Sequence, residues 1–152
     1  MIKLHRLIST CLGIGYTPKG GGTVAAIACC IAWYLLQAGR NESAFIPVLA
    51  TSLVFLTGVW SSGKMEAFWG KDSYRIVIDE VAGMCLTLLF VPVCWQNLLT
   101  GLILFRFFDI AKPLYIRKME KLNGGWGVMM DDMLAGLYAN IILQFIVMCK
   151  LW

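Results

Sequence analysis

Acidic residues within apolar stretches are the most informative feature of the sequence. The chain has 9 Asp and Glu residues, and five of them lie in or beside apolar segments: Asp79, Glu80, Asp109, Asp131 and Asp132. A carboxylate at or inside a membrane is costly unless it is paired, hydrated or bound to a cation. These positions make a small hydrophobic chain a candidate metal-dependent enzyme.

The types of ligand present in the sequence narrow the choice of metal ion. Carboxylates are hard oxygen ligands, which suit Mg²⁺ and, as the alternative, Mn²⁺. His5 is the only histidine, and the 6 cysteines form no CxxC pair. A zinc site and histidine-dependent phosphatase chemistry are therefore not expected.

Basic residues near these acids point to a phosphate. In FRFFDIAKP, Arg106, Asp109 and either Lys112 or Pro113 recur at spacings that place them on one helical face, and Pro113 ends or kinks the helix. A guanidinium matches the geometry of an oxyanion. The alternative is an Arg106–Asp109 ion pair that only neutralises both groups. Carboxylates, Mg²⁺ and cations at one membrane face predict phosphoryl chemistry on a lipid headgroup.

A glycine-rich segment, GIGYTPKGGGT over residues 13–23, precedes the first long apolar run. Such a loop before a helix presents backbone N–H groups to an anion, with Lys19 adding charge and Thr23 as a helix N-cap. It is not a Walker A loop, because GK[ST] is missing at the required spacing. The alternative is a flexible turn beside the membrane.

The two acidic pairs differ in how specifically they indicate a functional site. Asp79 and Glu80 point about 100° apart on a helix, so we expect at most one to face a given partner squarely. Their alternative role is a solvated helix start that complements the helix dipole. Asp131 and Asp132, in GGWGVMMDDMLAG, lie within an apolar helix whose Gly136 and neighbouring alanines permit close helix packing.

Composition predicts the elements that position these residues. The chain is 59% hydrophobic and 14% charged, against about 45–50% and 25% for soluble domains. We expect one all-α domain over residues 1–152, a polytopic membrane bundle with an N-terminal interfacial helix near Leu4–Leu12, or a frayed terminus there. The five expected membrane-associated helices are Thr23–Gln37, Ala44–Trp60, Ile76–Trp95, the short Asn97–Ile110, and Val128–Cys149.

The distribution of basic residues predicts the orientation. Eleven of the 13 Lys and Arg residues fall on one side of these helices: Lys3, Arg6, Lys19, Lys64, Lys71, Arg75, Arg106, Lys112, Arg117, Lys118 and Lys121. Arg40 and Lys150 fall on the other side. Cytoplasmic loops carry the Lys and Arg excess. We expect a cytoplasmic N-terminus, five crossings and an external C-terminus, with all four motifs at the cytoplasmic face.

The order of the motifs resembles a known family. GxGxxPK…GT, DExxG, FRxFDxxKP and GGxGxMxDDxxAG occur in sequence between residues 13 and 139, as in the bacterial phosphatidylglycerophosphatase A family. The family usually has PGT where this chain has Gly21, Gly22 and Thr23, a departure that loosens the loop and removes no reactive group. The resemblance implies a helical, Mg²⁺-dependent phosphatase of the inner membrane that converts phosphatidylglycerophosphate to phosphatidylglycerol. Its partners would be the membrane and an anionic phospholipid, with no nucleic acid.

The resemblance also implies residue roles. Asp79, Asp109, Asp131 and Asp132 would be catalytic, and these four with Glu80 would bind the metal. Phosphate binding would fall to Lys19, Gly22, Thr23, Arg106 and Lys112. Attack by metal-activated water is favoured over attack by an aspartate, because the DxDx pattern of aspartyl-phosphate phosphatases is absent.

Three other functions compete with this interpretation. One is a phosphatase for another lipid phosphate or a polyprenyl pyrophosphate. A second is a CDP-alcohol phosphotransferase, which is disfavoured because its DGxxAR…GxxxDxxxD pattern is missing. The third, from a different class, is a small cation transporter, since such proteins use intramembrane acids. It is disfavoured because the acids cluster at one face with cations beside them.

Overall fold

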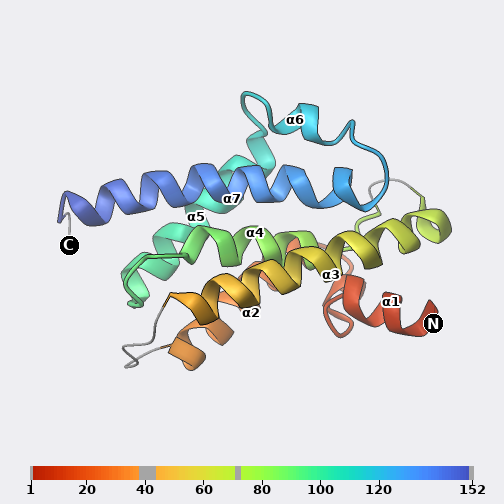
Figure 1. The fold of residues 1–152 in the computed structure, drawn as a ribbon, viewed down its shortest axis with the longest axis horizontal. Coiled ribbons are helices and arrows are strands. Elements are labelled where there is room, and N and C mark those ends of the chain that lie inside the picture. Colours follow the sequence, from red (N-terminus) through yellow and green to blue (C-terminus); the bar gives the residue numbers. More distant parts are fainter. Residues whose placement is uncertain (1, 38–43, 71–72, 151–152) are drawn as a thin grey trace.

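The computed structural model describes residues 2–37, 44–70 and 73–150, and this part of the chain is helical without strands (Figure 1). The prediction of an all-α fold is therefore confirmed. In chain order the elements are α1 (Ile2–Ser9), the 3₁₀ helix η1 (Ile14–Tyr16), α2 (Gly21–Gln37), α3 (Phe45–Trp69), α4 (Ile78–Leu88), α5 (Trp95–Ala111), α6 (Ile116–Met119) and α7 (Gly125–Met148).

Helix α4 lies at the centre of the bundle and contacts α2, α3, α5 and α7. In Figure 1 it lies between the two longest helices, α3 and α7. It has 11 residues, or about 16 Å of helix, so the predicted helix Ile76–Trp95 was too long. The Asn140 amide donates to the carbonyl oxygens of Thr87 and Leu89, both at 2.8 Å, and thereby satisfies the helix end. Pro92 then opposes any continuation.

Two glycines allow α4 and α7 to touch through their backbones. A Cβ atom on Gly136 would lie 2.3 Å from the Gly83 carbonyl oxygen. A Cβ atom on Gly83 would lie 2.6 Å from the Asp132 carbonyl oxygen. The close-packing face predicted around Gly136 is thus present, and it sets the acidic segment of α7 directly on α4.

Three other helix boundaries test the sequence analysis. Helix α3 continues past the predicted end at Trp60 to Trp69, because Ser62 and Met65 are buried there, and it stops at Gly70, whose φ is 83°. Helix α5 ends before Pro113, as predicted. Helix α2 begins at Gly21, so Thr23 lies inside the first turn and does not cap the helix.

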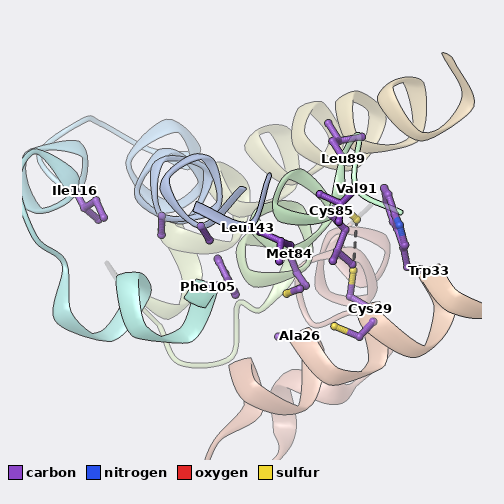
Figure 2. Close-up of a cluster of buried hydrophobic side chains, with 14 residues drawn as sticks. Ala26, Cys29, Trp33, Met84, Cys85, Leu89, Val91, Phe105, Ile116 and Leu143 are labelled. Carbon is purple, nitrogen blue, oxygen red and sulfur yellow. Dashed lines mark hydrogen bonds between the residues drawn. The ribbon is translucent and has the colours of Figure 1, made fainter. Parts of the chain in front are cut away.

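A buried apolar cluster joins α2, α4, α5 and α7 (Figure 2). Trp33, Phe105 and Leu143 belong to it, and the latter two are fully buried. Cys29 and Cys85 meet across α2 and α4 with their sulfur atoms 3.4 Å apart. All six cysteines are free thiols. This cluster holds the helices that carry the acidic motifs in fixed relative positions.

Within the described residues, two helices are long and apolar enough to cross a bilayer, Phe45–Trp69 and Gly125–Met148. The predicted count of five crossings stays a prediction, and Arg40 and Lys71 lie outside the described residues. Helix α1 is shorter than the predicted Leu4–Leu12. It packs on α3 through the buried His5, whose ring centre lies 4.3 Å from that of Trp60.

Candidate active site

A polar cavity of about 240 Å³ opens where α4, α5, α6 and α7 converge. The five predicted carboxylates and the predicted cation Lys112 line it, although they come from three motifs far apart in the sequence. Among the described residues, the lining consists of Ser73, Tyr74, Ile76, Asp79, Glu80, Asp109, Lys112, Glu120, Val128, Asp131 and Asp132. The fold therefore brings all five predicted acids to one cavity.

Three of these acids are close enough to share a cation. One oxygen each from Asp79, Glu80 and Asp132 lie within 4.8 Å of one another, and Asp132 is only 3% exposed. Asp79 and Glu80 both reach this cluster, so the expectation that at most one of the pair would face a partner was wrong. Their side chains are long enough to converge on Asp132, which α7 places against the first turn of α4.

The residues present fit a divalent metal. Buried carboxylates held close together repel one another unless a cation or protons compensate them. Glu80 Oε2 and Asp131 Oδ1 are buried and accept no hydrogen bond within the described residues. An all-oxygen donor set with free lone pairs is what Mg²⁺ prefers. Asp79, Glu80 and Asp132 are the residues that could hold it.

Among the described residues that line the cavity, Lys112 is the one cation. Its Nζ donates to Asp131 Oδ2 at 2.8 Å and to Glu120 Oε1 at 2.6 Å. Burial lowers the pKa of Lys112, but the hydrogen bonds to Asp131 and Glu120 outweigh it and hold the pKa above its ordinary value. Lys112 also has a left-handed backbone, φ 45°, at the end of α5 and immediately before Pro113. Few residues adopt this conformation before proline, so the position is strained in a way common at functional sites.

Arg106 and Asp109 form an ion pair on α5, with Nη1 and Oδ2 2.6 Å apart. This is the pairing that the sequence left open as an alternative to phosphate binding. Asp109 nevertheless lines the cavity, whereas Arg106 lies just outside the lining residues. The Arg106 Nε is buried and makes no hydrogen bond within the part of the chain described.

The glycine-rich segment meets the site at one residue. A Cβ atom on Gly22 would lie 1.9 Å from Glu80 Oε1, so the start of α2 packs directly on this carboxylate. Lys19 and Thr23 do not line the cavity, and Lys19 is exposed in the turn before α2. Of the predicted phosphate-binding residues, the fold therefore places Lys112 in the cavity and Gly22 at its edge.

Sequence reasoning missed Glu120, Ser73 and Tyr74. Glu120 lies in the basic segment RKMEKL, without the apolar surroundings that singled out the other acids. Its only sequence signal is its position eight residues after Lys112, across the turn that Pro113 begins. Ser73 and Tyr74 lie in the connection between α3 and α4, which carries no motif.

Comparison with known proteins identifies the family. The family model for phosphatidylglycerophosphatase A matches residues 7–147. The chain belongs to the phosphatidylglycerophosphatase A family. Two proteins named phosphatidylglycerophosphatase A are similar to it: one from Haemophilus influenzae, 37% identical over 90% of this chain and 85% of that protein, and one from Escherichia coli, 33% identical over 92% and 81%.

A third relative carries a different name. A Bacteroides thetaiotaomicron protein named "Putative phosphatidylinositol-3-phosphatase" is 41% identical over 90% of this chain and 89% of its own length. No solved structure matches the chain. The family is one of phosphatases, so the chain is a phosphoric monoester hydrolase, and the two kinds of name agree on a phospholipid phosphate as substrate.

Proposed function

We propose that this chain is a Mg²⁺-dependent phosphatidylglycerophosphatase acting in glycerophospholipid biosynthesis. It would hydrolyse the terminal phosphate monoester of phosphatidylglycerophosphate to give phosphatidylglycerol and inorganic phosphate. The observation that carries the proposal is the convergence of Asp79, Glu80 and Asp132 within 4.8 Å in a cavity that also holds Lys112. Family membership supports the reaction, and the donor set supports the metal.

The residues divide between binding and proton transfer. Asp79, Glu80 and Asp132 would hold Mg²⁺, which when bound supplies Lewis-acid stabilisation of phosphate charge. Lys112 stays protonated and would attract the phosphate oxygens. Asp109 and Asp131 line the same cavity and would transfer protons. Lys19 and Thr23, which lie outside the lining, are not assigned to the reaction step.

The hydrolysis proposed is direct. A water oxygen bonds to phosphorus, the bond from phosphorus to the glycerol oxygen breaks, and that oxygen leaves as a hydroxyl after gaining a proton. A cavity carboxylate, Asp109 or Asp131, would accept the proton that the water loses and pass it to the leaving glycerol oxygen. The buried position of Asp131 Oδ1, without a hydrogen-bond partner in the described chain, suits this acceptor role.

We further propose a multi-pass protein of the bacterial cytoplasmic membrane, with the cavity facing the cytoplasm. Lys and Arg residues gather at the loops nearest the cavity, which supports this orientation. A reporter fused to the C-terminus tests the five-crossing arrangement. An external reporter agrees with it, and a cytoplasmic reporter contradicts it.

A second candidate substrate follows from one comparison. The Bacteroides relative named for phosphatidylinositol 3-phosphate is 41% identical to this chain. Both lipids carry a phosphate monoester beside a phosphodiester, so the same cavity chemistry applies to either. Substrate choice would then depend on the room around the headgroup and not on the carboxylates.

The test is phosphate release by the purified protein in detergent. The substrates are phosphatidylglycerophosphate, phosphatidylinositol 3-phosphate, phosphatidic acid and a polyprenyl pyrophosphate, each with and without Mg²⁺. Mg²⁺-dependent release, fastest from phosphatidylglycerophosphate, is expected. Release fastest from another lipid would reassign the substrate, and release from none would refute the enzymatic proposal.

Direct attack by water is tested in a single turnover with radiolabelled terminal phosphate, stopped by acid. All label should appear as free phosphate or unreacted lipid. Label retained on the denatured protein would instead show a phospho-aspartate, and Asp109→Asn and Asp131→Asn would identify its position.

A further inference from the structure

Helices α2 and α5 enclose an apolar furrow of about 410 Å³ on the outside of the bundle. This volume falls within the roughly 300–1,000 Å³ range of small-molecule sites. Its lining includes Ile27, Ile31, Leu98, Leu99 and Leu102, and the lining as a whole is almost free of polar atoms. The Cys30 thiol lies 4.0 Å from the Leu98 carbonyl oxygen, where the two helices come close together.

One face of α5 connects this furrow to the catalytic cavity. Leu98, Leu102, Arg106 and Asp109 follow at spacings of four, four and three residues, so they form one stripe along the helix. The stripe is apolar where it lines the furrow and charged where Asp109 enters the cavity. Arg106 lies one turn beyond Leu102, at the transition from apolar to charged residues.

Helix α2 also has its N-terminal end at the site, but Gly22 and Ile27 point about 140° apart around the helix, so the site and the furrow lie on different faces of α2. Gly22 packs on Glu80 at the edge of the cavity. Thr23 lies one turn before Ile27, which begins the apolar lining, and the lining then continues to Leu35. The two helices therefore have their polar ends at the same end of the furrow.

The dimensions fit one lipid tail. From Ile27 to Leu35 the helix rises about 12 Å, close to the roughly 15 Å depth of one leaflet of hydrocarbon. A phospholipid with its phosphate in the cavity has its acyl chains attached a short distance away. Such a molecule is polar and then apolar in the order that the stripe on α5 presents.

Another apolar groove is less well placed. It lies between α1, α2 and α4 and is lined by Ile78 and Val81. The mean direction of Ile78 and Val81 on α4 is about half a helical turn from the mean direction of Asp79 and Glu80. Of these two grooves, the α2–α5 furrow lies along the face of α5 that also carries Arg106 and Asp109.

We propose that the α2–α5 furrow binds one acyl chain of the lipid substrate while the phosphate monoester occupies the carboxylate cavity. This inference rests on the proposed lipid phosphatase function and adds an acyl-chain site to it. Tail binding in the furrow would set the distance between the membrane-embedded part of the substrate and the cavity. Substrates with short chains would lose this contribution.

The test compares two substitutions of equally exposed isoleucines. Ile31→Trp fills the furrow, and Ile141→Trp on α7 is its control, because the two side chains are 56% and 57% exposed. Each variant is assayed with dioleoyl and dihexanoyl phosphatidylglycerophosphate in mixed micelles. For Ile31→Trp the ratio of kcat/KM for the long-chain over the short-chain substrate should fall about tenfold, the effect of losing roughly two buried CH₂ groups. Ile141→Trp should keep the wild-type ratio.

An unchanged ratio in Ile31→Trp, or the same change in Ile141→Trp, would overturn the acyl-chain site. A second measurement does not depend on turnover. Photocrosslinking of the wild-type protein by phosphatidylglycerophosphate with a diazirine in its acyl chain should label peptides 27–35 and 95–102. Unlabelled phosphatidylglycerophosphate should suppress that labelling, and equal suppression by phosphatidylcholine would show an ordinary bilayer contact and overturn the proposal. If the wild-type protein releases no phosphate from any lipid, the proposed function fails, whereas the crosslinking result still reports on the furrow.

Discussion

Gly22 lies so close to Glu80 that a single methyl group at position 22 would fall 1.9 Å from the Glu80 Oε1 atom. The contact links the glycine-rich start of α2 to a carboxylate of the candidate metal site. Because the opposing atom is the end of a flexible side chain, the carboxylate can move away at little cost to the fold. A substitution at this contact should therefore affect catalysis while leaving the stability of the fold nearly unchanged.

Gly22→Ala should therefore reduce kcat by at least about tenfold, the lower end of the effect of disturbing the support of a metal ligand, with a nearly unchanged melting temperature. Gly21→Ala is the matched control, since its nearest neighbour would be 3.6 Å away. Steady-state kinetics and thermal unfolding of both variants measure this. Equal activities of the two variants would mean that the position of Glu80 does not matter to turnover.

Gly136→Ala should show the opposite pattern, with a clear loss of folding stability. Its added methyl group would lie 2.3 Å from the Gly83 carbonyl oxygen. That oxygen belongs to the backbone, so it cannot move away as the end of a side chain can. We expect a loss of at least about 2 kcal/mol of stability, or at least about 4 °C in melting temperature. In Gly101→Ala the nearest neighbours are side-chain methyl groups at 3.1–3.3 Å, so its loss should be smaller. A melting temperature for Gly136→Ala at or above that of Gly101→Ala would contradict the close contact of α4 and α7.

Replacing the carboxylates should strongly reduce turnover without unfolding the protein. Asp132→Asn, Asp131→Asn and Asp109→Asn should each lower kcat on the order of 10²- to 10⁴-fold, the range for loss of acid–base or comparable catalytic groups. Glu120→Gln is the comparison, because Glu120 reaches Lys112 but its side chain is 37% exposed. It should lower kcat less than tenfold. Size-exclusion profiles confirm folding, and near-normal activity of Asp132→Asn would remove the cluster from the mechanism.

Metal removal should be visible both in activity and in stability. Treatment with EDTA should stop phosphate release, and Mg²⁺ should restore it. At a Mg²⁺ concentration about 100 times the Kd, the wild-type protein should gain roughly 2.7 kcal/mol of stability. Asp132→Asn should lose most of this gain, as measured by thermal unfolding with and without Mg²⁺. The same Mg²⁺-induced gain in that variant would place the metal elsewhere.

Much of the site followed from the sequence because acids in apolar surroundings are rare. Asp131 and Asp132 stood out within an apolar run, and Pro113 marked the end of α5 correctly. The end of α4 was missed because it depends on Asn140, a residue 51 positions after Leu89, whose amide satisfies the helix terminus. Glu120 was missed for a similar reason: its contact with Lys112 exists only after α6 folds back over the cavity.

Lys19 and Thr23 were predicted to bind phosphate, but neither residue lines the cavity. Both belong to a glycine-rich segment whose backbone conformation cannot be derived from composition. The helix begins at Gly21, so the residue that meets the acids is Gly22, which has no side chain at all.

The backbone contact between Gly83 and Gly136 also sets the distances between the carboxylates of the candidate metal site. Asp79 and Glu80 lie one turn before Gly83, and Asp132 lies one turn before Gly136, so a contact between two uncharged atoms fixes the spacing of three charged groups. The carboxylates are held together by the folded bundle before any ion arrives, and protons compensate their proximity until a cation replaces them. A binding cation therefore finds its ligands already assembled and does not have to bring them together.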